Sequence, residues 1–324
     1  MKIAVYGVGA IGGYIGALLA RRGVDVSLIA RGPHLAAIRE RGLSLGGRTG
    51  GFTVHPFCTD DPAEAGPQDV VILAVKAHQV PGIVDRLAPL LGPDTAVVGA
   101  QNGLPWWYFH KHGGRYDDQR LASVDPGGVQ WRAIGPERAI GCVVWQAARL
   151  IAPGVIEHTF GDNMVLGEPD GSRSDRALAL AEVLTGAGIE TTVEPDIRQQ
   201  IWLKLWGNLS FNPVSVLTHA TLQGLALDRG ARAVIAAMMA ESREIGERLG
   251  VSFPLSIEQR IKAARDVGPH KSSMLQDLEA GRTMEIEPLI GVIVELGRLV
   301  GVPTPTIEMI YDLVVLRAKQ ADDR

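Results

Sequence analysis

Three polar residues share one face of a predicted helix in the stretch IWLKLWGNLSFNP, from Ile201 to Pro213. Lys204, Asn208 and Asn212 follow one another at intervals of four residues, which places their side chains on the same side of a helix. The residues around them are apolar, and an amide that is removed from water must find hydrogen-bond partners. A lysine and two amides on one face could therefore bind a polar ligand. The plainer interpretation is a solvated lysine beside two amides that cap neighbouring turns.

A second motif lies near the amino terminus, where Gly7, Gly9 and Gly12 form the pattern G-x-G-x-x-G. The pattern lies between a predicted strand at Lys2–Tyr6 and an amphipathic segment that runs to about Arg22. The first glycine permits a tight turn, the second lets the backbone approach a pyrophosphate, and the third lets helix and strand pack closely. Glycines also serve ordinary turns, but in this strand-turn-helix context they predict a dinucleotide site whose phosphates rest on the helix N-terminus.

The second predicted strand, Val24–Ala30, is followed by Arg31, nineteen residues after Gly12. An NAD site usually has Asp or Glu at this place for the ribose 2′-hydroxyl, whereas a cation suits the 2′-phosphate of NADP. Arg31 therefore favours NADP. The alternative is a surface arginine at the entrance of a helix.

Two further strands also end in polar residues. Val70–Val75 is followed by Lys76, and Thr95–Ala100 is followed by the sequence QNG, which contains Asn102. The carboxyl ends of parallel strands face the cofactor crevice in this kind of fold, so Lys76 and Asn102 are candidates for contacts to cofactor or substrate. Asn-Gly is also an ordinary turn signal.

The whole pattern predicts an α/β chain, with a Rossmann-type dinucleotide-binding domain followed by an all-helical domain. Further strands are expected as one or two short antiparallel strands within 43–58, and at 140–147, 154–159, 164–166 and 189–193, with a helix at 174–186. The later periodicity is helical, with segments at 196–212, 214–225, 230–249, 257–267, 272–278, 287–300 and 306–319. Pro213 is expected to stop or kink its helix. The predicted domains are residues 1–194 and 195–324.

The roles of two pairs of residues in the helical half are not decided by the local pattern. Ser272 and Ser273 stand at a predicted helix start, where a hydroxyl can simply cap the first turn. Glu285 and Glu287 flank an apolar residue, so only one of these two carboxylates is expected to point inward.

A long loop from Leu104 to Pro136 interrupts the regular pattern. Loops of this length are functional or flexible. Its aromatic cluster, Trp106–Phe109, is typical of a packing anchor for the loop itself. His110 and His112 have no cysteine or carboxylate company, so a polar loop is favoured over a metal site.

Composition excludes several classes of function. The net charge is −4, and 21% of residues are charged, so nothing points to nucleic acid or an anionic membrane. No run approaches the ~18 apolar residues of a membrane span. The sequence opens on a strand without an export signal, and its two cysteines, Cys58 and Cys142, suit a reducing compartment. A cytoplasmic protein is expected.

Taken together, these residues resemble the ketopantoate reductase (2-dehydropantoate 2-reductase) family over nearly the whole chain. The resemblance rests on six motifs in order: GVGAIGG with Arg31, VKAHQ around Lys76, QNG at 101–103, KLWGNLSFNP at 204–213, SSMLQD at 272–277 and RTMEIE ending in Glu287. It implies that NADPH reduces the 2-keto group of ketopantoate to (R)-pantoate, on the route to pantothenate and coenzyme A.

The resemblance also implies roles for individual residues. Lys204 matches the lysine that protonates the developing alkoxide, and Glu285 matches the acid that orients lysine and substrate. Asn208 and Asn212 match amides that hold the hydroxyl end of the substrate, Ser273 matches a carboxylate contact, and Asn102 matches a residue that links substrate and cofactor. The implied cofactor-binding residues are Gly7, Gly9, Ala10, Ile11, Gly12, Arg31, Lys76 and Asn102. No metal is expected.

The sequence departs from the family in the long loop at 104–136 and at Pro288 and Ile290, which follow the acidic residue. Another 2-keto acid therefore remains an alternative substrate, and a non-catalytic NADP-binding redox sensor is a third hypothesis. A sensor has no need of the Lys204, Asn208 and Glu285 constellation. The partner is expected to be a small molecule, and the apolar helical half would also suit a homodimer.

Overall fold

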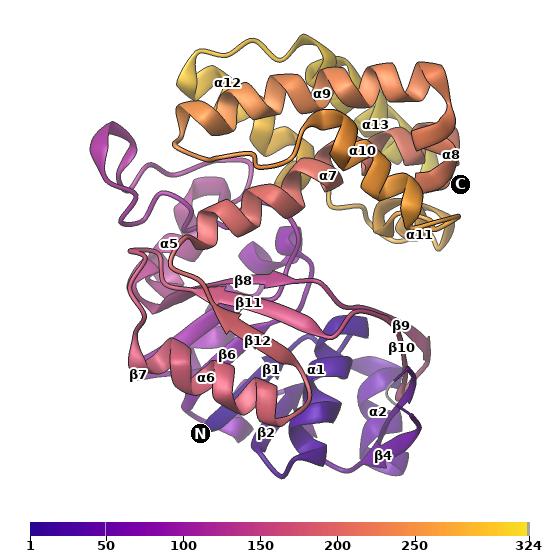
Figure 1. Cartoon of the computed structure of the whole chain (residues 1–324). Coiled ribbons are helices and arrows are strands. Elements are labelled where there is room, and N and C mark those ends of the chain that lie inside the picture. The colour runs from indigo at the N-terminus through magenta and orange to yellow at the C-terminus, as the bar shows by residue number, and fades with distance from the viewer. Residues whose placement is uncertain (49, 323–324) are drawn as a thin grey trace. The chain divides into compact units, whose positions relative to one another are not determined.

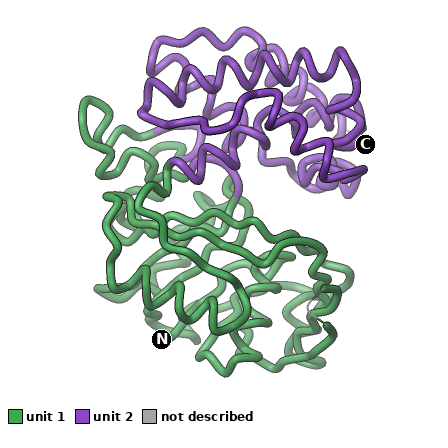
Figure 2. The backbone as a smooth tube through the Cα atoms, viewed as in Figure 1, with its two compact units in different colours: residues 1–101, 105–120, 125–198 green, residues 102–104, 121–124, 199–324 purple. Residues whose placement is uncertain are grey.

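The computed structural model describes residues 1–48 and 50–322. The chain divides into two compact units, drawn in green and purple in Figure 2. Unit 1 contains residues 1–101, 105–120 and 125–198, and unit 2 contains residues 102–104, 121–124 and 199–324. Two short segments from the first half of the sequence are thus built into unit 2.

The core of unit 1 is an eight-stranded sheet within the described residues, in the order β12-β11-β8-β7-β6-β1-β2-β5 (Figure 1). Every neighbouring pair is parallel except β8 with β11. Branched aliphatic residues fill the strands because both faces of such a sheet are covered. The strands are β1 (Lys2–Tyr6), β2 (Asp25–Ile29), β5 (Phe57–Thr59), β6 (Gln68–Leu73), β7 (Leu91–Gly99), β8 (Ala139–Val144), β11 (Asn163–Gly167) and β12 (Glu190–Val193).

A second sheet in unit 1 has the order β4-β3-β10-β9. It is formed by β3 (Leu43–Gly47), β4 (Phe52–Val54), β9 (Ala147–Ala152) and β10 (Val155–Phe160). The antiparallel pair expected within 43–58 is β3 with β4. One expected strand, 140–147, is wrong as a single element. The chain leaves β8 at Val144 and starts β9 at Ala147 in the other sheet.

Helices complete unit 1. They are α1 (Ala10–Arg21), α2 (Gly32–Arg41), α3 (Pro62–Ala65), α4 (Val84–Leu87), α5 (Val129–Ile134) and α6 (Asp175–Gly186), with short 3₁₀ turns η1 (Ala77–Gly82), η2 (Ala88–Leu90), η3 (Gly114–Tyr116), η4 (Pro126–Gly128) and η5 (Pro136–Arg138). The Ser174 hydroxyl accepts from the Ala177 N–H and so begins α6 one residue later, as a polar N-cap does.

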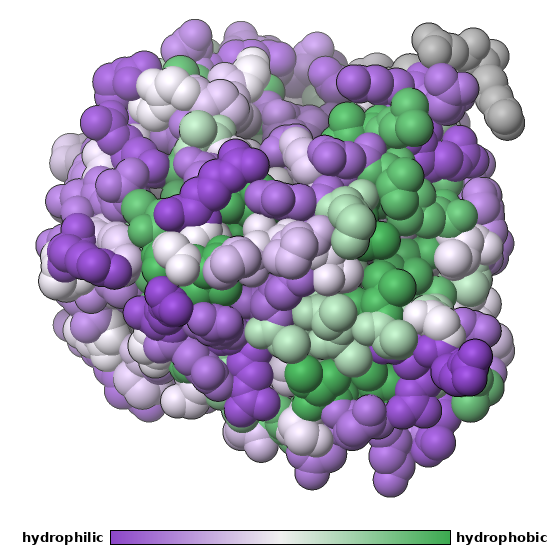
Figure 3. All heavy atoms as spheres, turned by 90° about the horizontal axis from the view of Figure 1, so that it is seen from above, coloured by the Kyte–Doolittle hydropathy of each residue, from purple (hydrophilic) through white to green (hydrophobic). Residues whose placement is uncertain are grey.

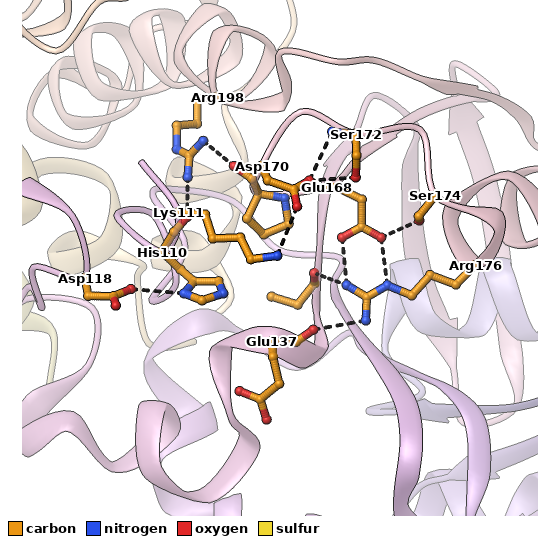
Figure 4. A network of polar contacts seen from close by, with 12 residues as sticks. His110, Lys111, Asp118, Glu137, Glu168, Asp170, Ser172, Ser174, Arg176 and Arg198 are labelled. Carbon is orange, nitrogen blue, oxygen red and sulfur yellow. Dashed lines mark hydrogen bonds and ion pairs between the residues drawn. The ribbon is translucent and has the colours of Figure 1, made fainter. Parts of the chain in front are cut away.

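Buried aromatic residues and polar contacts hold residues 105–120 of the long loop within unit 1, and Figure 4 shows part of the polar network. The four side chains of Trp106–Phe109 are buried, which confirms the packing role of the aromatic cluster. The Arg198 guanidinium donates to the carbonyl oxygens of Tyr108, His110 and Pro169 at 2.6–2.8 Å. His110 Nδ1 lies 3.0 Å from the Asp118 carboxylate, so the expectation that this histidine has no carboxylate beside it is wrong.

Unit 2 is helical. Its elements are α7 (Ile197–Thr218), which starts in the last residues of unit 1, then α8 (Leu222–Leu227), α9 (Arg229–Arg248), α10 (Ile257–Asp266), α11 (Ser273–Glu279), the π-helical turn η6 (Glu287–Gly291), α12 (Val292–Val300) and α13 (Pro305–Asp322). Trp202 and Trp206 on α7 are almost fully buried and pack against Phe253. The Trp206 indole N–H donates to the Met239 carbonyl at 2.9 Å, so α7 is bound into the core on this side.

The expectation that Pro213 divides two helices at 212/214 is wrong, because α7 continues past it to Thr218. A proline inside a helix removes one backbone hydrogen bond. The residues after it, Val214 and Val216, are buried, so packing outweighs the local preference of the proline.

Apolar side chains also reach the surface. A band of hydrophobic residues is visible in Figure 3. The exposed hydrophobic residues of unit 2 include Met309, Leu313 and Leu316, and their spacing puts them on one side of α13. None of the described helices is both long and apolar enough to cross a membrane.

Candidate active site

The polar face predicted on α7 is present, and the apolar residues around it explain its position. Trp202, Trp206 and Leu209 are buried in the core of unit 2. Lys204 and Asn208 are only partly buried, whereas Asn212 is 4% exposed. The helix therefore turns its apolar sides into the core and carries its polar stripe from a partly open end to a closed one.

Asn212 is the most informative member of this stripe. Its side-chain nitrogen, Nδ2, is buried and has no hydrogen-bond partner among the described residues. An unpaired buried polar group costs roughly 1–3 kcal/mol, and native proteins rarely leave such a group without protein, water or ligand. The side-chain nitrogen therefore caps no neighbouring turn among the described residues. It is available to an acceptor from water or a ligand.

A second polar pair belongs to unit 2 although its members are 183 residues apart. Asn102 Nδ2 donates to Glu285 Oε2 at 3.4 Å. Glu285 is 8% exposed, whereas Glu287 is exposed and accepts a hydrogen bond from the Tyr311 hydroxyl at 2.7 Å. The inward carboxylate of the two is thus Glu285. Burial and the neighbouring Glu287 raise the pKa of Tyr311 to about 12, so Tyr311 stays a neutral donor.

The turn that carries Asn102 is fixed by the segment that follows Glu285. Leu104 N–H donates to the Pro288 carbonyl at 3.0 Å. Gly103 has φ +95°, and a Cβ atom at this position would lie 2.3 Å from the same oxygen. Only glycine fits there, because the backbone is left-handed and the space is filled. The close packing of two backbone segments keeps Asn102 beside Glu285.

The two adjacent serines have different roles. Ser272 is buried, caps α11 through the Leu275 N–H, and lies 2.5 Å from the Ser215 hydroxyl on α7. Ser273 is exposed, and its hydroxyl makes no hydrogen bond to the described residues. The cap is therefore Ser272. Ser215 stands three residues after Asn212, so its bond to Ser272 brings the start of α11, with Ser273, next to the closed end of the stripe.

In unit 1, the three glycines of the fingerprint have different surroundings. Gly7 has φ +94°, and a Cβ atom there would lie 2.5 Å from Val75 Cγ1; one at Gly12 would lie 2.1 Å from the Gly7 carbonyl oxygen. A Cβ atom at Gly9 would meet nothing within 4 Å. Gly9 is the N-cap of α1, and no side chain caps this helix. Open space in front of uncapped N–H groups is what a pyrophosphate requires.

Two of the predicted cations stand along the same edge of the sheet. Arg31 follows β2, Lys76 follows β6, and β1, which ends at Tyr6, lies between those two strands. Arg31 is exposed and forms no ion pair with the described residues. Burial raises the pKa of Tyr6, and the charges of Arg86 and Arg31 oppose this rise. Two cationic side chains thus act on Tyr6, the last residue of β1.

The predicted site residues therefore fall into two groups. Unit 1 holds the glycine turn with Ala10 and Ile11, together with Arg31 and Lys76. Unit 2 holds Lys204, Asn208, Asn212, Ser273, Glu285 and Asn102. Among the residues that the structure describes, no three His, Cys, Asp or Glu side chains come together as a metal site would require.

Models of a known family match most of this sequence. The family described as "Ketopantoate reductase PanE/ApbA" matches residues 3–171, and "Ketopantoate reductase PanE/ApbA C terminal" matches residues 196–318. The chain belongs to the ketopantoate reductase family.

Individual members of the family agree along their whole length. The 2-dehydropantoate 2-reductase of Mesorhizobium japonicum is 52% identical over 316 residues, which are 97% of each chain. A crystal structure from Ralstonia solanacearum, described as a candidate ketopantoate reductase, superposes with a TM-score of 0.94 at 41% identity, covering 99% of this chain and 98% of that one. D-mandelate dehydrogenase with NADH and anilino(oxo)acetate has a TM-score of 0.82 at 23% identity, covers 99% of each chain, and shares the fold.

Sequence reasoning missed two polar groups that shape this ketopantoate reductase site. Ser215 follows the stripe by three residues, but a serine in a helix interior gives no signal beyond its spacing. Tyr311, whose hydroxyl donates to Glu287, comes from α13 and is remote in sequence. Only the folded chain brings it there.

Proposed function

We propose that this protein reduces 2-dehydropantoate to (R)-pantoate with NADPH. Its 52% identical relative is named 2-dehydropantoate 2-reductase. The observation that carries the proposal is the polar site within unit 2. It combines a lysine, an inward carboxylate and a buried amide nitrogen without a partner among the described residues, on a scaffold that matches the family over most of its length. A reductase uses all three groups, whereas a protein that only binds NADP needs none of them.

The proposed roles follow from the chemistry of each side chain. NADPH, when bound, supplies the hydride that goes to the keto carbon. Lys204 donates a proton to the oxygen as the carbonyl becomes an alcohol, and its ammonium offsets the negative charge that develops there. Glu285 orients Lys204 and the substrate. Asn208 and Asn212 donate to substrate oxygens.

The remaining contacts complete the assignment. Ser273, whose hydroxyl makes no hydrogen bond to the described residues, contacts the carboxylate, and Asn102 links substrate and cofactor. Residues 195–324 form the substrate-binding and catalytic domain in this proposal.

The residues of unit 1 fit NADP. Gly7, Gly9, Ala10, Ile11 and Gly12 form a turn with free space at Gly9 and uncapped N–H groups at the start of α1. Arg31, which forms no ion pair with the described residues, suits the 2′-phosphate, and Lys76 adds a second positive charge. Residues 1–194 are the NADP-binding domain in this proposal.

The test is NADPH oxidation with ketopantoate and with a panel of other 2-keto acids. We expect ketopantoate to have the highest kcat/KM, and NADPH to be used in preference to NADH. Tight NADPH binding without turnover of any keto acid would favour the redox-sensor hypothesis instead.

One observation favours a second candidate, a reductase for another 2-keto acid. Pro288 is one of the departures from the family pattern, and its carbonyl oxygen packs against Gly103 and accepts from Leu104. The departure thus lies directly beside the Asn102–Glu285 pair. If a different keto acid exceeds ketopantoate in kcat/KM, the second candidate is the physiological activity.

We also propose that the protein is a cytoplasmic homodimer. The exposed stripe of Met309, Leu313 and Leu316 on α13 offers an apolar surface to a second copy. Light scattering should give twice the 34.6 kDa mass of one chain. Met309→Lys with Leu313→Lys should then restore the single mass.

A further inference from the structure

Arg260 on α10 occupies a space that glycine leaves open on α7. A Cβ atom built on Gly207 would lie 1.9 Å from Arg260 Nη2, 2.7 Å from Cζ and 3.2 Å from Nε. The guanidinium therefore rests on the helix backbone, at the place where any other residue 207 would put its side chain. Because these atoms are the end of a flexible chain, a larger residue at 207 would displace the guanidinium rather than break the fold.

This position is next to the polar stripe. Gly207 stands three residues after Lys204 and one before Asn208, so it lies about 60° around the helix from Lys204. Gly207, Lys204, Asn208 and Arg260 all belong to unit 2. The guanidinium thus borders the face that carries the proposed proton donor.

Nothing in the described part of the chain neutralises Arg260. Its guanidinium has no hydrogen bond, ion pair or aromatic contact there. Burial lowers the pKa of Arg260, and no carboxylate opposes this effect. Arg198 is a useful contrast. Burial lowers its pKa as well, but its guanidinium donates to three backbone carbonyls, which is the usual condition of a structural arginine.

The proposed substrate carries a negative charge that is not yet matched by a cation. A 2-keto acid carries a carboxylate next to its keto group. In the proposed reaction the Lys204 ammonium is engaged at the keto oxygen, and Glu285 adds a negative charge to the site. No cation of unit 2 is yet assigned to the substrate carboxylate, and the only group assigned to it is the neutral Ser273 hydroxyl.

We propose that Arg260 binds the carboxylate of the 2-keto acid, and that Gly207 is required because its missing side chain makes room for the guanidinium. The inference rests on the proposed function, of which it names the anion-recognising residue. A guanidinium suits this task because its planar N–H groups match the two oxygens of a carboxylate. Arg260 then sets the preference for an acid over a neutral ketone.

The experiment compares full-length variants with the best keto acid of the panel and with its neutral amide. Arg260→Gln removes the charge, Arg260→Lys keeps the charge without the fork, and Gly207→Ala fills the space. Arg265→Gln is the matched control, because Arg265 is an exposed arginine on the same helix that pairs with Asp266. Thermal unfolding and the Kd for NADPH are measured for each variant.

We expect Arg260→Gln to raise the KM for the keto acid by about 10- to 100-fold, the worth of hydrogen bonds between charged groups. The KM for the neutral amide and the Kd for NADPH should stay within about twofold. Arg260→Lys should fall between wild type and Arg260→Gln. Gly207→Ala should weaken acid binding in the same direction, and combining it with Arg260→Gln should add little, since both act through one guanidinium.

Other outcomes overturn the inference. If Arg260→Gln folds and leaves the preference for acid over amide unchanged, Arg260 does not bind the carboxylate. A rise in the Kd for NADPH instead would assign the guanidinium to the cofactor. If Arg260→Gln is unstable, Gly207→Ala provides the same comparison. A wild-type enzyme that reduces no keto acid would refute the proposed function, which is a separate result.

Discussion

Replacing Asn212 with leucine should raise the free energy of unfolding and lower kcat/KM. The side-chain nitrogen of Asn212 is buried without a partner among the described residues, which costs roughly 1–3 kcal/mol in the ligand-free protein. Leucine has a similar shape and no polar atoms. We therefore expect Asn212→Leu to raise the free energy of unfolding by about 1 kcal/mol, which corresponds to a Tm higher by ~2–4 °C.

The kinetic effect should have the opposite sign. If Asn212 donates to a substrate oxygen, leucine leaves that oxygen unpaired in a closed site, at a cost of about 1–3 kcal/mol. This corresponds to a fall of roughly 5- to 150-fold in kcat/KM. Differential scanning calorimetry and steady-state NADPH oxidation on the same preparation give both values.

The control is Ser210→Ala on the same helix. Ser210 is also buried, but its hydroxyl donates to the Trp206 carbonyl at 3.0 Å. Removing a satisfied group should lower Tm slightly and leave kcat/KM unchanged. If Asn212→Leu instead lowers both Tm and kcat/KM, Asn212 has a structural partner in solution and the reasoning fails.

Three further predictions concern other parts of the chain. Lys204→Ala should lower kcat by about 100-fold or more, the usual contribution of a proton donor, while fluorescence titration finds the Kd for NADPH unchanged; intact turnover would end the proposed role. Arg31→Ala should raise the KM for NADPH by about 10- to 100-fold with little effect on NADH, and equal effects on both cofactors would rule out a 2′-phosphate contact. His34 Nδ1 accepts from the Gly154 N–H at 2.9 Å, and burial lowers the pKa of His34. The unfolded chain therefore takes up this proton first as pH falls, so stability is complete above about pH 6.5 and decreases below it, by at most about 1.4 kcal/mol per pH unit. Unfolding scans between pH 7 and 5 should show a smaller decrease for His34→Gln.

Local sequence patterns predicted most of the architecture, because the elements of unit 1 follow simple rules. The strands are uninterrupted apolar runs, and the glycines at 7, 9 and 12 each have one physical reason to be there. The stripe on α7 was predictable in the same way, since spacing alone places Lys204, Asn208 and Asn212 on one face. Predicted helix boundaries were wrong where tertiary packing opposed a local signal, as at Pro213.

The open alternatives were decided by contacts between distant residues. Glu285 and Glu287 are equivalent in a local pattern, and the difference comes from Asn102 on one side and Tyr311 on the other. Sequence periodicity gives no means of pairing residues 183 positions apart. Arg260 is a similar case, because its proposed role depends on the space that Gly207 leaves open on α7.

A short segment from the first half of the sequence belongs to the helical unit, and this limits which fragments of the chain contain a complete unit 2. Residues 121–124 belong to unit 2, where the Ala122 and Ser123 N–H groups and the Ser123 hydroxyl donate to the Glu295 carboxylate at 2.6–2.8 Å. A fragment that begins at residue 195 would lack these donors and leave that carboxylate without them. During synthesis, Ala122 and Ser123 must wait until about 170 more residues have been added before Glu295 exists. The helical unit is therefore complete only when residues 121–124 are part of the same chain.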